Sequence, residues 1–371
     1  MDRDILELAV DVRHRLHAHP ELSNQELWTR HYLMELLRER TKLEIVDRGQ
    51  WFYAKYTAGR DLPWVAFRTE MDGLPIEDRI DRPYVSTVPG VGHKCGHDGH
   101  MAALTALALE VDRHGANKNV CFLFQHAEET GDGAPVCAAL LKEEPIGEIF
   151  AWHNRPGEPL GTVLLREGTL YCASRGMIIE YEGVASHAAY PENGKNPAFA
   201  MAELLLALPG LTDLPDRRGL TMATVIQVAA GEPAFGTQAH AGRLLLTVRA
   251  AVQEDLERLQ AALEAAAKQG ADRHGLKIRF SYCDDFPVTR CHAGSVEKIR
   301  AACAKLGVPV RELAEPYRGS EDFGHYTRLT PGAYFEIGSG EDCCPYHTVG
   351  LDFPDACIPV AVDVMLELLN D

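Results

Sequence analysis

Several features are missing from this sequence, and each absence excludes a class of protein. No run of 18 apolar residues occurs, so we expect no membrane-spanning helix, and Met1-Asp2-Arg3-Asp4 opens a polar helix instead of a signal peptide. No C-x-x-C pair occurs among the ten cysteines, which indicates reduced thiols instead of a disulfide framework. Basic residues number 37 against 54 acidic ones, a net charge of -17, so we expect neither nucleic acid nor an anionic membrane surface as a partner. These absences predict a soluble, cytoplasmic protein.

The length of the chain and the order of its expected elements indicate two domains. A chain of 371 residues exceeds what one hydrophobic core usually organises. Over residues 1–175 and 284–371, apolar strands alternate with helices, which predicts an α/β domain with a mostly parallel sheet. Its clearest strands are expected at 64–68, 120–124, 149–152 and 333–337. Residues 176–283 instead follow the order β-α-β-β-α-β, a ferredoxin-like insertion that we expect to serve as a dimerisation or lid domain.

Two helices are expected ahead of the first strand. The first covers residues 4–16, and a capping box formed by Ser23 and Glu26 starts the second, which should run to about Arg40. Four histidines lie on these helices or directly after the first one, far from any strand end, and we assign them no role: His14, His17, His19 and His31.

The stretch Gly92–His100 concentrates groups that bind metals. It holds a thiol, three imidazoles and a carboxylate in nine residues. Cys95 and His97 are two residues apart among glycines, so both side chains can face one ion. A helix is expected to follow, and its positive N-terminal dipole favours the thiolate form of Cys95. Asp98 and His100 are expected to cap this helix or to orient neighbouring groups.

Further polar groups come after the expected strands, at their carboxyl ends. Asp72 follows the strand at 64–68, Glu128 and Glu129 follow 120–124, His153 follows 149–152, and His347 lies in the loop after 333–337. Since the carboxyl ends of parallel strands meet at one edge of a sheet, these side chains should converge with those of the Gly92–His100 stretch.

Such a set can hold two metal ions and leave one carboxylate to deprotonate an attacking water. The expected metal ligands are Cys95, His97, Glu129, His153 and His347. Glu128 is the expected general base, because neighbouring residues at a strand end point in different directions. Asp72 is expected to orient an imidazole or to bridge the site. A simpler interpretation of the same residues is a solvated turn at Glu128-Glu129 and hydrogen-bonded core or surface histidines at 153 and 347.

Several segments, spread over the chain, resemble the signatures of a known family in that family's order. They are His17–Ser23, Met71–Ile76, Cys95–Met101, Ala127–Glu129 and Gly319–Gly324. The family is that of the two-domain dinuclear metallopeptidases of the aminoacylase and carboxypeptidase group, in its N-acyl-amino-acid amidohydrolase branch. The segment Gly183–Pro191 also resembles part of the domain that is inserted in this family.

The resemblance implies roles for the candidate residues. The five expected ligands would hold two divalent ions of manganese, zinc, cobalt or nickel, with Glu128 as base and acid and with Asp72 supporting a ligand. His187 would stabilise the oxyanion, often from the partner subunit, which implies a homodimer formed through the inserted domain. The substrate would be an N-acyl amino acid, for instance an N-acetyl one, cleaved to the free amino acid and a carboxylic acid.

The sequence also departs from the family pattern at two places. Glu70 stands where the branch usually has Asp, one methylene shorter. Gly236–His240 replaces a motif whose Asn commonly helps to hold the substrate carboxylate. Arg249 stands at the family's arginine position and can bind a carboxylate bidentately, and His240 is a second candidate for this contact.

Other functions fit parts of the same pattern. Within the family, the alternatives are an N-acetyldiaminopimelate deacetylase, which the short chain favours, and a dipeptidase. Outside it, a metal-binding regulatory protein that has lost catalysis should lack the base, and this chain keeps Glu128. A thiol nucleophile at Cys95 would instead need a general-base partner and no metal.

Overall fold

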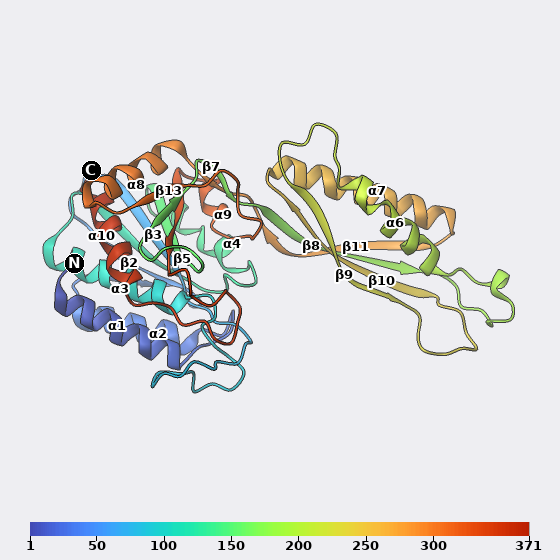
Figure 1. Ribbon diagram of the computed structural model, residues 1–371, viewed down its shortest axis with the longest axis horizontal. Helices are drawn as coiled ribbons and strands as arrows, with labels where there is room; N and C mark the ends of the chain where they lie inside the picture. Colours follow the sequence, from blue (N-terminus) through green and yellow to red (C-terminus); the bar gives the residue numbers. More distant parts are fainter. Residues whose placement is uncertain (371) are drawn as a thin grey trace. The chain divides into compact units, whose positions relative to one another are not determined.

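The computed structural model describes residues 1–370, which form two compact units (Figure 1). Unit 1 consists of Met1–Leu170, Thr289–Glu315 and the chain from Asp322 onward, and unit 2 consists of Tyr171–Val288 and Pro316–Glu321. Unit 2 is therefore wider at both ends than the predicted insertion at 176–283. The reason is that its first strand in chain order begins at Ala173 and its last strand ends at Phe286, beyond the apolar stretches of the sequence.

Unit 1 is built on an eight-stranded sheet. Its strands are β1 (Glu44–Asp47), β2 (Phe52–Tyr56), β3 (Trp64–Glu70), β4 (Asn119–Gln125), β5 (Ile146–Arg155), β6 (Val163–Leu165), β13 (Val310–Glu312) and β14 (Gly332–Gly338). They lie in the order β1-β2-β4-β3-β5-β14-β6-β13, and β4, β3, β5 and β14 at the centre run parallel to one another. The mostly parallel sheet is thus confirmed. The three-residue strands β6 and β13 were not predicted, because so few residues carry no recognisable period.

Helices cover this sheet, and a small second sheet completes unit 1. The helices are α1 (Arg3–Ala18), α2 (Leu27–Arg40), α3 (His97–His114), α4 (Gly133–Cys137), α5 (Leu140–Glu143), α8 (Ala293–Leu306), α9 (Gly324–Thr327) and α10 (Cys357–Leu369). α3 packs against the central strands, and α1 and α10 pack against α3 (Figure 1). Strands β7 (Gly168–Tyr171) and β12 (Thr289–Cys291) form the two-stranded sheet. Because α3 is buried along almost its whole length, its first turn is fixed against the sheet.

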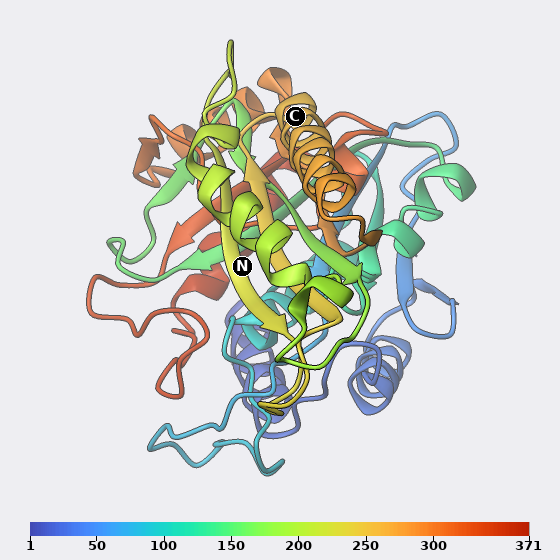
Figure 2. The ribbon, with the colours of Figure 1, turned by 90° about the vertical axis from the view of Figure 1, so that its right-hand side faces the viewer.

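Unit 2 has the predicted β-α-β-β-α-β order. Its elements are β8 (Ala173–Glu182), the short 3-10 helix η1 (Pro191–Asn193), α6 (Pro197–Leu211), β9 (Thr221–Ala230), β10 (Ala241–Ala250), α7 (Gln253–Arg273) and β11 (Lys277–Phe286). The four strands form an antiparallel sheet in the order β11-β8-β10-β9. Figure 2 shows α6 and α7 side by side over this sheet. The side chain of Asn196 accepts a hydrogen bond from the backbone N of Ala198, which confirms the predicted start of α6.

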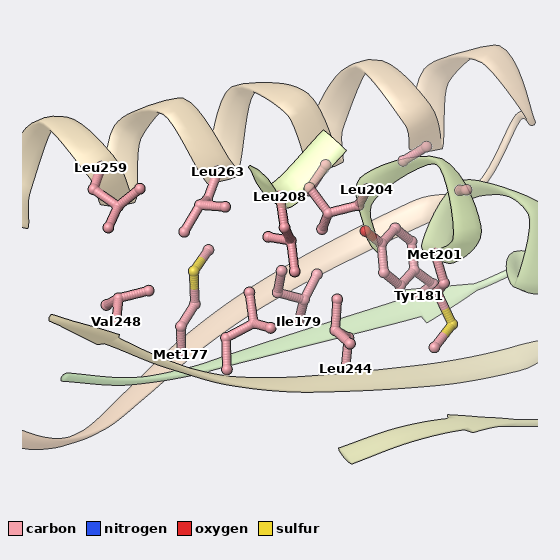
Figure 3. Close-up of a cluster of buried hydrophobic side chains, with 14 of the residues drawn as sticks. Met177, Ile179, Tyr181, Met201, Leu204, Leu208, Leu244, Val248, Leu259 and Leu263 are labelled. Carbon is pink, nitrogen blue, oxygen red and sulfur yellow. The ribbon is translucent and has the colours of Figure 1, made fainter. Parts of the chain in front are cut away.

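The core of unit 2 lies between its two helices and its sheet. Figure 3 shows apolar side chains from both helices above those of the strands, with Leu259 and Leu263 from α7, Leu204 from α6, and Ile179 and Leu244 from β8 and β10. Each of these five side chains is almost fully buried. Because this cluster contains residues of unit 2 alone, the unit has its own hydrophobic core.

The predicted capping box at the start of α2 is wrong. The backbone N atoms of Trp28 and Thr29 donate to the carboxylate of Glu21, at 3.0 and 2.8 Å. Ser23 and Glu26 do not cap the helix, because their side chains bind groups near the candidate site instead. The cap therefore comes from a residue outside the local S-x-x-E pattern.

Two expectations from the missing features can be checked against the described residues. Within residues 1–370, no helix is both long enough and apolar enough to cross a membrane. All ten cysteines are free thiols, which confirms that the chain has no disulfide framework.

Candidate metal centre

The parallel strands of unit 1 deliver the candidate residues to one edge of the sheet. β3 ends at Glu70, just before Asp72, and β4 ends at Gln125, just before Glu128 and Glu129. His153 lies near the end of β5, and the loop that follows β14 carries His347. The central strands are parallel neighbours, so these ends lie together, at the first turn of α3.

The structure brings all five expected ligands together, in two groups of three. The donor atoms of Cys95, His97 and His153 lie within 4.8 Å of one another, and so do those of Cys95, Glu129 and His347. The sulfur of Cys95 belongs to both groups and lies 3.4 Å from Nε2 of His153. One atom shared by two sets of ligands is the arrangement of a site that holds two ions side by side.

Asp72 orients His97 within this arrangement. Nδ1 of His97 donates to the backbone carbonyl of Asp72 at 2.9 Å and lies 3.3 Å from its carboxylate. The same carboxylate accepts hydrogen bonds from the Ser23 hydroxyl at 2.7 Å and from the backbone N of Glu129 at 2.9 Å. Burial alone would raise the pKa of Asp72, but the hydrogen bonds from His97, Glu129 and Ser23 hold it below its usual range. Asp72 is therefore a charged support that leaves Nε2 of His97 directed at the site.

A matching arrangement orients His153. Its Nδ1 donates to the backbone carbonyl of Asn154 at 2.8 Å, which leaves the lone pair of Nε2 for the site. The Tyr346 ring packs edge-on against the imidazole, with ring centroids 5.1 Å apart. In both candidate ligand rings, His97 and His153, the protein thus binds Nδ1 and leaves Nε2 for the site.

Backbone contacts hold the loop of His347 at the site. It has a φ of 57°, in the left-handed region, and its N atom donates to the carbonyl of Lys94 at 2.8 Å. The buried ammonium of Lys94 in turn donates to Asp78 and to the carbonyl of Leu351. The loop of residue 347 is therefore tied to the residue that precedes Cys95.

The donor atoms themselves fit metal ions. Nε2 of His97 and Oε1 of Glu129 are buried and make no hydrogen bond within the described part of the chain. Nε2 of His97 lies 3.8 Å from Oε2 of Glu128 and 3.9 Å from Oε1 of Glu129, too far for hydrogen bonds. Ligand atoms about 2.0–2.3 Å from one ion lie roughly 3–4 Å from each other. A thiol, imidazoles and a carboxylate at this spacing are the donors that divalent transition metals prefer.

The expectation that the helix dipole favours the thiolate of Cys95 is wrong for the groups of the protein alone. Burial, followed by the charges of Glu129 and Glu128, raises the pKa of the thiol well above its usual range. A cation is what lowers the pKa of a thiol in such a place. Burial and the neighbouring carboxylates thus outweigh the effect of the backbone dipole on the thiol.

The two other polar residues of the Cys95 loop orient groups and do not cap the helix. The N-cap of α3 is Gly96, which has a φ of 108°, in the range that favours glycine, and Asn154 fills the space that a side chain would need. His100 donates from Nδ1 to Glu70 at 3.0 Å and contacts Oδ1 of Asn154 at 2.9 Å. Asp98 binds Nδ1 of His17 at 2.8 Å.

Glu70, the residue that departs from the family pattern, is fully buried beside the site. Burial would raise its pKa, but the charges of Arg68 and His100 hold the pKa well below its usual range. Its two carboxylate oxygens are divided between Arg68 and His100. The longer side chain therefore serves a buried ion pair, and one of its carboxylate oxygens also lies within 4.8 Å of a ring nitrogen of His97 and of His100.

His17, to which the sequence pattern assigns no role, lies in a buried network beside the site. The ring is fully buried, with Nδ1 2.8 Å from Asp98 and Nε2 3.0 Å from Asp78. Arg13 also binds Asp98 and lies on the same helix. The signal was the segment His17–Ser23, which matched a family signature although its residues lay far from any strand end. It links α1 to the loop that carries Cys95 and His97.

The remaining candidates lie in unit 2. His187 is exposed, and its Nδ1 accepts a hydrogen bond from the backbone N of Ala189 at 3.0 Å, so Nε2 carries the proton. His240 is exposed as well. Arg249, on β10, donates to the carbonyl of Arg318 and to the hydroxyl of Ser320, both at 3.0 Å, which ties residues 316–321 to unit 2.

Comparisons with known proteins agree with this architecture. The sequence profile of peptidase family M20/M25/M40 matches residues 66–371. The chain is 30% identical to the amidohydrolase YhaA of Bacillus subtilis, over 90% of this chain and 85% of the relative. It is 27% identical to the N-acetyldiaminopimelate deacetylase of Priestia megaterium, over 96% of both chains.

A solved structure shows the same relationship. The YXEP protein of Bacillus subtilis, described as a dinuclear metal-binding peptidase of the M20 family, matches with a TM-score of 0.86 and 26% identity, over 100% of this chain and 98% of the other. The family profile covers most of the chain, and the fold and the donor set agree with it. The chain therefore belongs to peptidase family M20/M25/M40.

Proposed function

We propose that this protein is a metal-dependent amidohydrolase that cleaves an N-acyl amino acid to the free amino acid and a carboxylic acid. The observation that carries the proposal is the pair of donor groups that share the sulfur of Cys95, with the carboxylate of Glu128 beside them. Cys95, His97, Glu129, His153 and His347 would hold two divalent ions, of manganese, zinc, cobalt or nickel. Bound there, the ions would polarise the scissile carbonyl and make water a better nucleophile.

Glu128 is the proposed general base and acid. Its carboxylate, one of the groups within 4.8 Å around Nε2 of His97, is largely buried and adjoins the ligand Glu129. It takes a proton from the attacking water as the oxygen bonds to the acyl carbon, and it returns the proton to the amine nitrogen as the amide bond breaks. Asp72 keeps the His97 ring in place through both steps.

The acyl group is proposed to be small, with acetyl as the first choice. The support is the similarity, over nearly the full length, to an N-acetyldiaminopimelate deacetylase. Deacetylation of N-acetyldiaminopimelate is also the first alternative function. A dipeptidase of the same family is the second alternative.

Arg249 and His240 are the proposed contacts for the substrate carboxylate. The cytoplasmic location stays a prediction from the sequence.

A homodimer formed through unit 2 is part of the proposal. Strand β9 lies at the edge of its sheet, is ten residues long, and exposes Ile226 and Val228 at 60% and 50%. Helix α6 exposes Phe199 and Leu206 at 61% and 84%. A long apolar edge strand is prone to pair with another chain, and pairing with its own copy would close the interface by two-fold symmetry. His187 would then donate from Nε2 to the oxyanion in the partner's site.

A hydrolysis screen tests the proposed function. Chelator-treated protein is reloaded with manganese, cobalt, zinc or nickel and offered N-acetyl amino acids, N-acetyldiaminopimelate and dipeptides, with release of the free amine as the readout. We expect turnover with loaded protein and none after chelation, with elemental analysis confirming the removal of metal. Amide hydrolysis that survives complete metal removal would refute the assignment of the site.

A further inference from the structure

The loop between α1 and α2 lies against the segments that carry Asp72 and Glu128. The carbonyl of Glu21 accepts from the backbone N of Gly73 at 2.7 Å, and the Ser23 hydroxyl donates to Asp72 at 2.7 Å. The carboxylate of Glu26 accepts from the backbone N of Ala127, also at 2.7 Å. This loop thus contacts the site at three successive points.

We propose that Glu26 is a positioning residue that holds the backbone turn at Ala127 and thereby aims the carboxylate of Glu128. The proposal rests on the proposed role of Glu128 as the base. Glu26 binds the backbone N of Ala127, not a candidate metal ligand, and it acts through the turn that follows β4.

The turn needs such a restraint because Ala127 has an unfavourable backbone conformation. Its φ is 49°, in the left-handed region, where a side chain on Cα is disfavoured. The residue is fully buried, so solvent does not satisfy its N-H group. A strained residue of this kind persists when the surrounding structure fixes it from several sides.

The surrounding bonds fix the turn from both of its ends. On the far side, the carbonyl of Ala127 accepts from the backbone N atoms of Asp132 and Gly133, at 3.2 and 3.0 Å, and the carbonyl of Glu128 accepts from Gly131 at 2.8 Å. On the near side, the amide of Ala127 binds Glu26. Without Glu26 the amide of Ala127 would lose its partner, and the turn would be held only by its own loop and by the hydrogen bond from the backbone N of Glu129 to Asp72.

The position of Glu26 is otherwise costly. The side chain is 4% exposed, and burial, followed by the charge of Asp72, raises its pKa to about 7. An acidic group in such a place is poorly solvated and gains little stability from its own charge. Stability therefore does not explain why a carboxylate is buried here, whereas its hydrogen bond to the strained turn does.

The experiment removes the acceptor and then the strain. Glu26→Met keeps the volume and loses the acceptor, Glu26→Gln keeps an acceptor oxygen, and Glu35→Met makes the same change at a more exposed position of α2 as the control. In metal-loaded protein, kcat, KM and bound metal are measured for each, and for Ala127→Gly alone and combined with Glu26→Met. A displacement of about 1 Å in a reacting group can lower turnover by roughly 10²-fold.

We expect Glu26→Met to lower kcat at least tenfold, with KM and metal content near those of the wild type. Glu26→Gln and Glu35→Met should stay within a few-fold of the wild type. Glycine adopts the left-handed region freely, so Ala127→Gly should restore part of the kcat that Glu26→Met loses. A merely structural role would lower stability without this selective loss and rescue.

Three results would overturn the proposal: wild-type kcat in Glu26→Met, loss of kcat only in proportion to lost metal, or an equal loss in Glu26→Gln. If Glu26→Met does not fold, Glu26→Asp withdraws the acceptor by one methylene, and wild-type kcat in that variant overturns the proposal as well. Failure of the proposed base shows separately, as full activity in Glu128→Gln.

Discussion

The hydroxyl of Tyr346 lies 3.3 Å from Nδ1 of His153 and also donates to the carbonyl of Asn154. Tyr346 directly precedes His347, so one residue joins the end of β5 to the loop of another candidate ligand. The side chain of Tyr346, which is not a candidate ligand, thus contacts His153 and anchors the loop that carries His347.

Tyr346→Phe should weaken metal binding. The variant keeps the ring that packs against His153 and loses the hydroxyl, and groups that orient metal ligands typically change affinity about 10- to 100-fold. Titration with cobalt, followed by its visible absorption, measures the affinity directly. Tyr32→Phe on α2 is the control and should bind cobalt as the wild type does. Equal affinity in the two variants would show that the hydroxyl does not orient the ligands.

The adjacent residues Glu128 and Glu129 should separate catalysis from metal binding. Glu128→Gln should keep its metal and lose turnover by roughly 10²-fold or more, the usual scale of general acid-base catalysis. Glu129→Gln should instead lose metal, because its carboxylate belongs to the group that contains Cys95 and His347. Metal content by elemental analysis and kcat on the same preparations check both. Near-normal turnover in Glu128→Gln would exclude it as the base.

Stability should fall between about pH 6.5 and pH 9 because of His17. Burial would lower the pKa of this ring, but the charge of Asp98 and the hydrogen bonds to Asp78 and Asp98 raise it to about 9, against the opposing charge of Arg13. Tyr84 and His93 also face the ring. A group whose pKa rises on folding stabilises the folded protein fully at a pH below its unfolded pKa. This stabilisation is lost as the pH rises through the folded pKa, and for His17 the loss is up to about 3 kcal/mol.

Urea unfolding of the wild type and of His17→Gln over this pH range measures the effect. The difference in unfolding free energy between the two should shrink as the pH rises to 9. His31→Gln, at an exposed position of α2, is the control and should keep the wild-type dependence. Parallel curves for the wild type and His17→Gln would mean that His17 is not charged in the folded protein.

His187 should act from the partner subunit. His187→Ala should lose turnover and keep its metal, and mixing it with Glu128→Gln under exchange conditions should restore activity, since one site of each heterodimer regains both groups. Ile226→Lys on the edge of β9 should give monomers in sedimentation experiments, whereas Leu160→Lys, at an exposed apolar residue of unit 1, should not. Full activity of a monomeric preparation would show that His187 acts within its own chain or not at all.

The predicted capping box and the unassigned His17 differ from the structure for the same reason, because these side chains bind partners far away in the chain. Ser23 and Glu26 fit a capping box, but their side chains bind Asp72 and Ala127, which are 49 and 101 residues away in the chain. The helix is capped instead by Glu21. His17 lay on a helix with no visible partner, and its partner Asp98 is 81 residues away. A local sequence pattern does not show whether a polar side chain will bind a nearby group or one that is distant in the chain.

The sequence by itself determined the architecture and the choice of candidate donors, because strand and helix periods and the residue types at strand ends are local properties. The central strands β3, β4, β5 and β14 lie where those periods placed them. The tertiary structure decided which donors share the sulfur of Cys95, which nitrogen of each histidine faces the site, and which side chains hold the turns in place. These depend on the directions of side chains from distant segments, and such directions are fixed only when the sheet and α3 pack together.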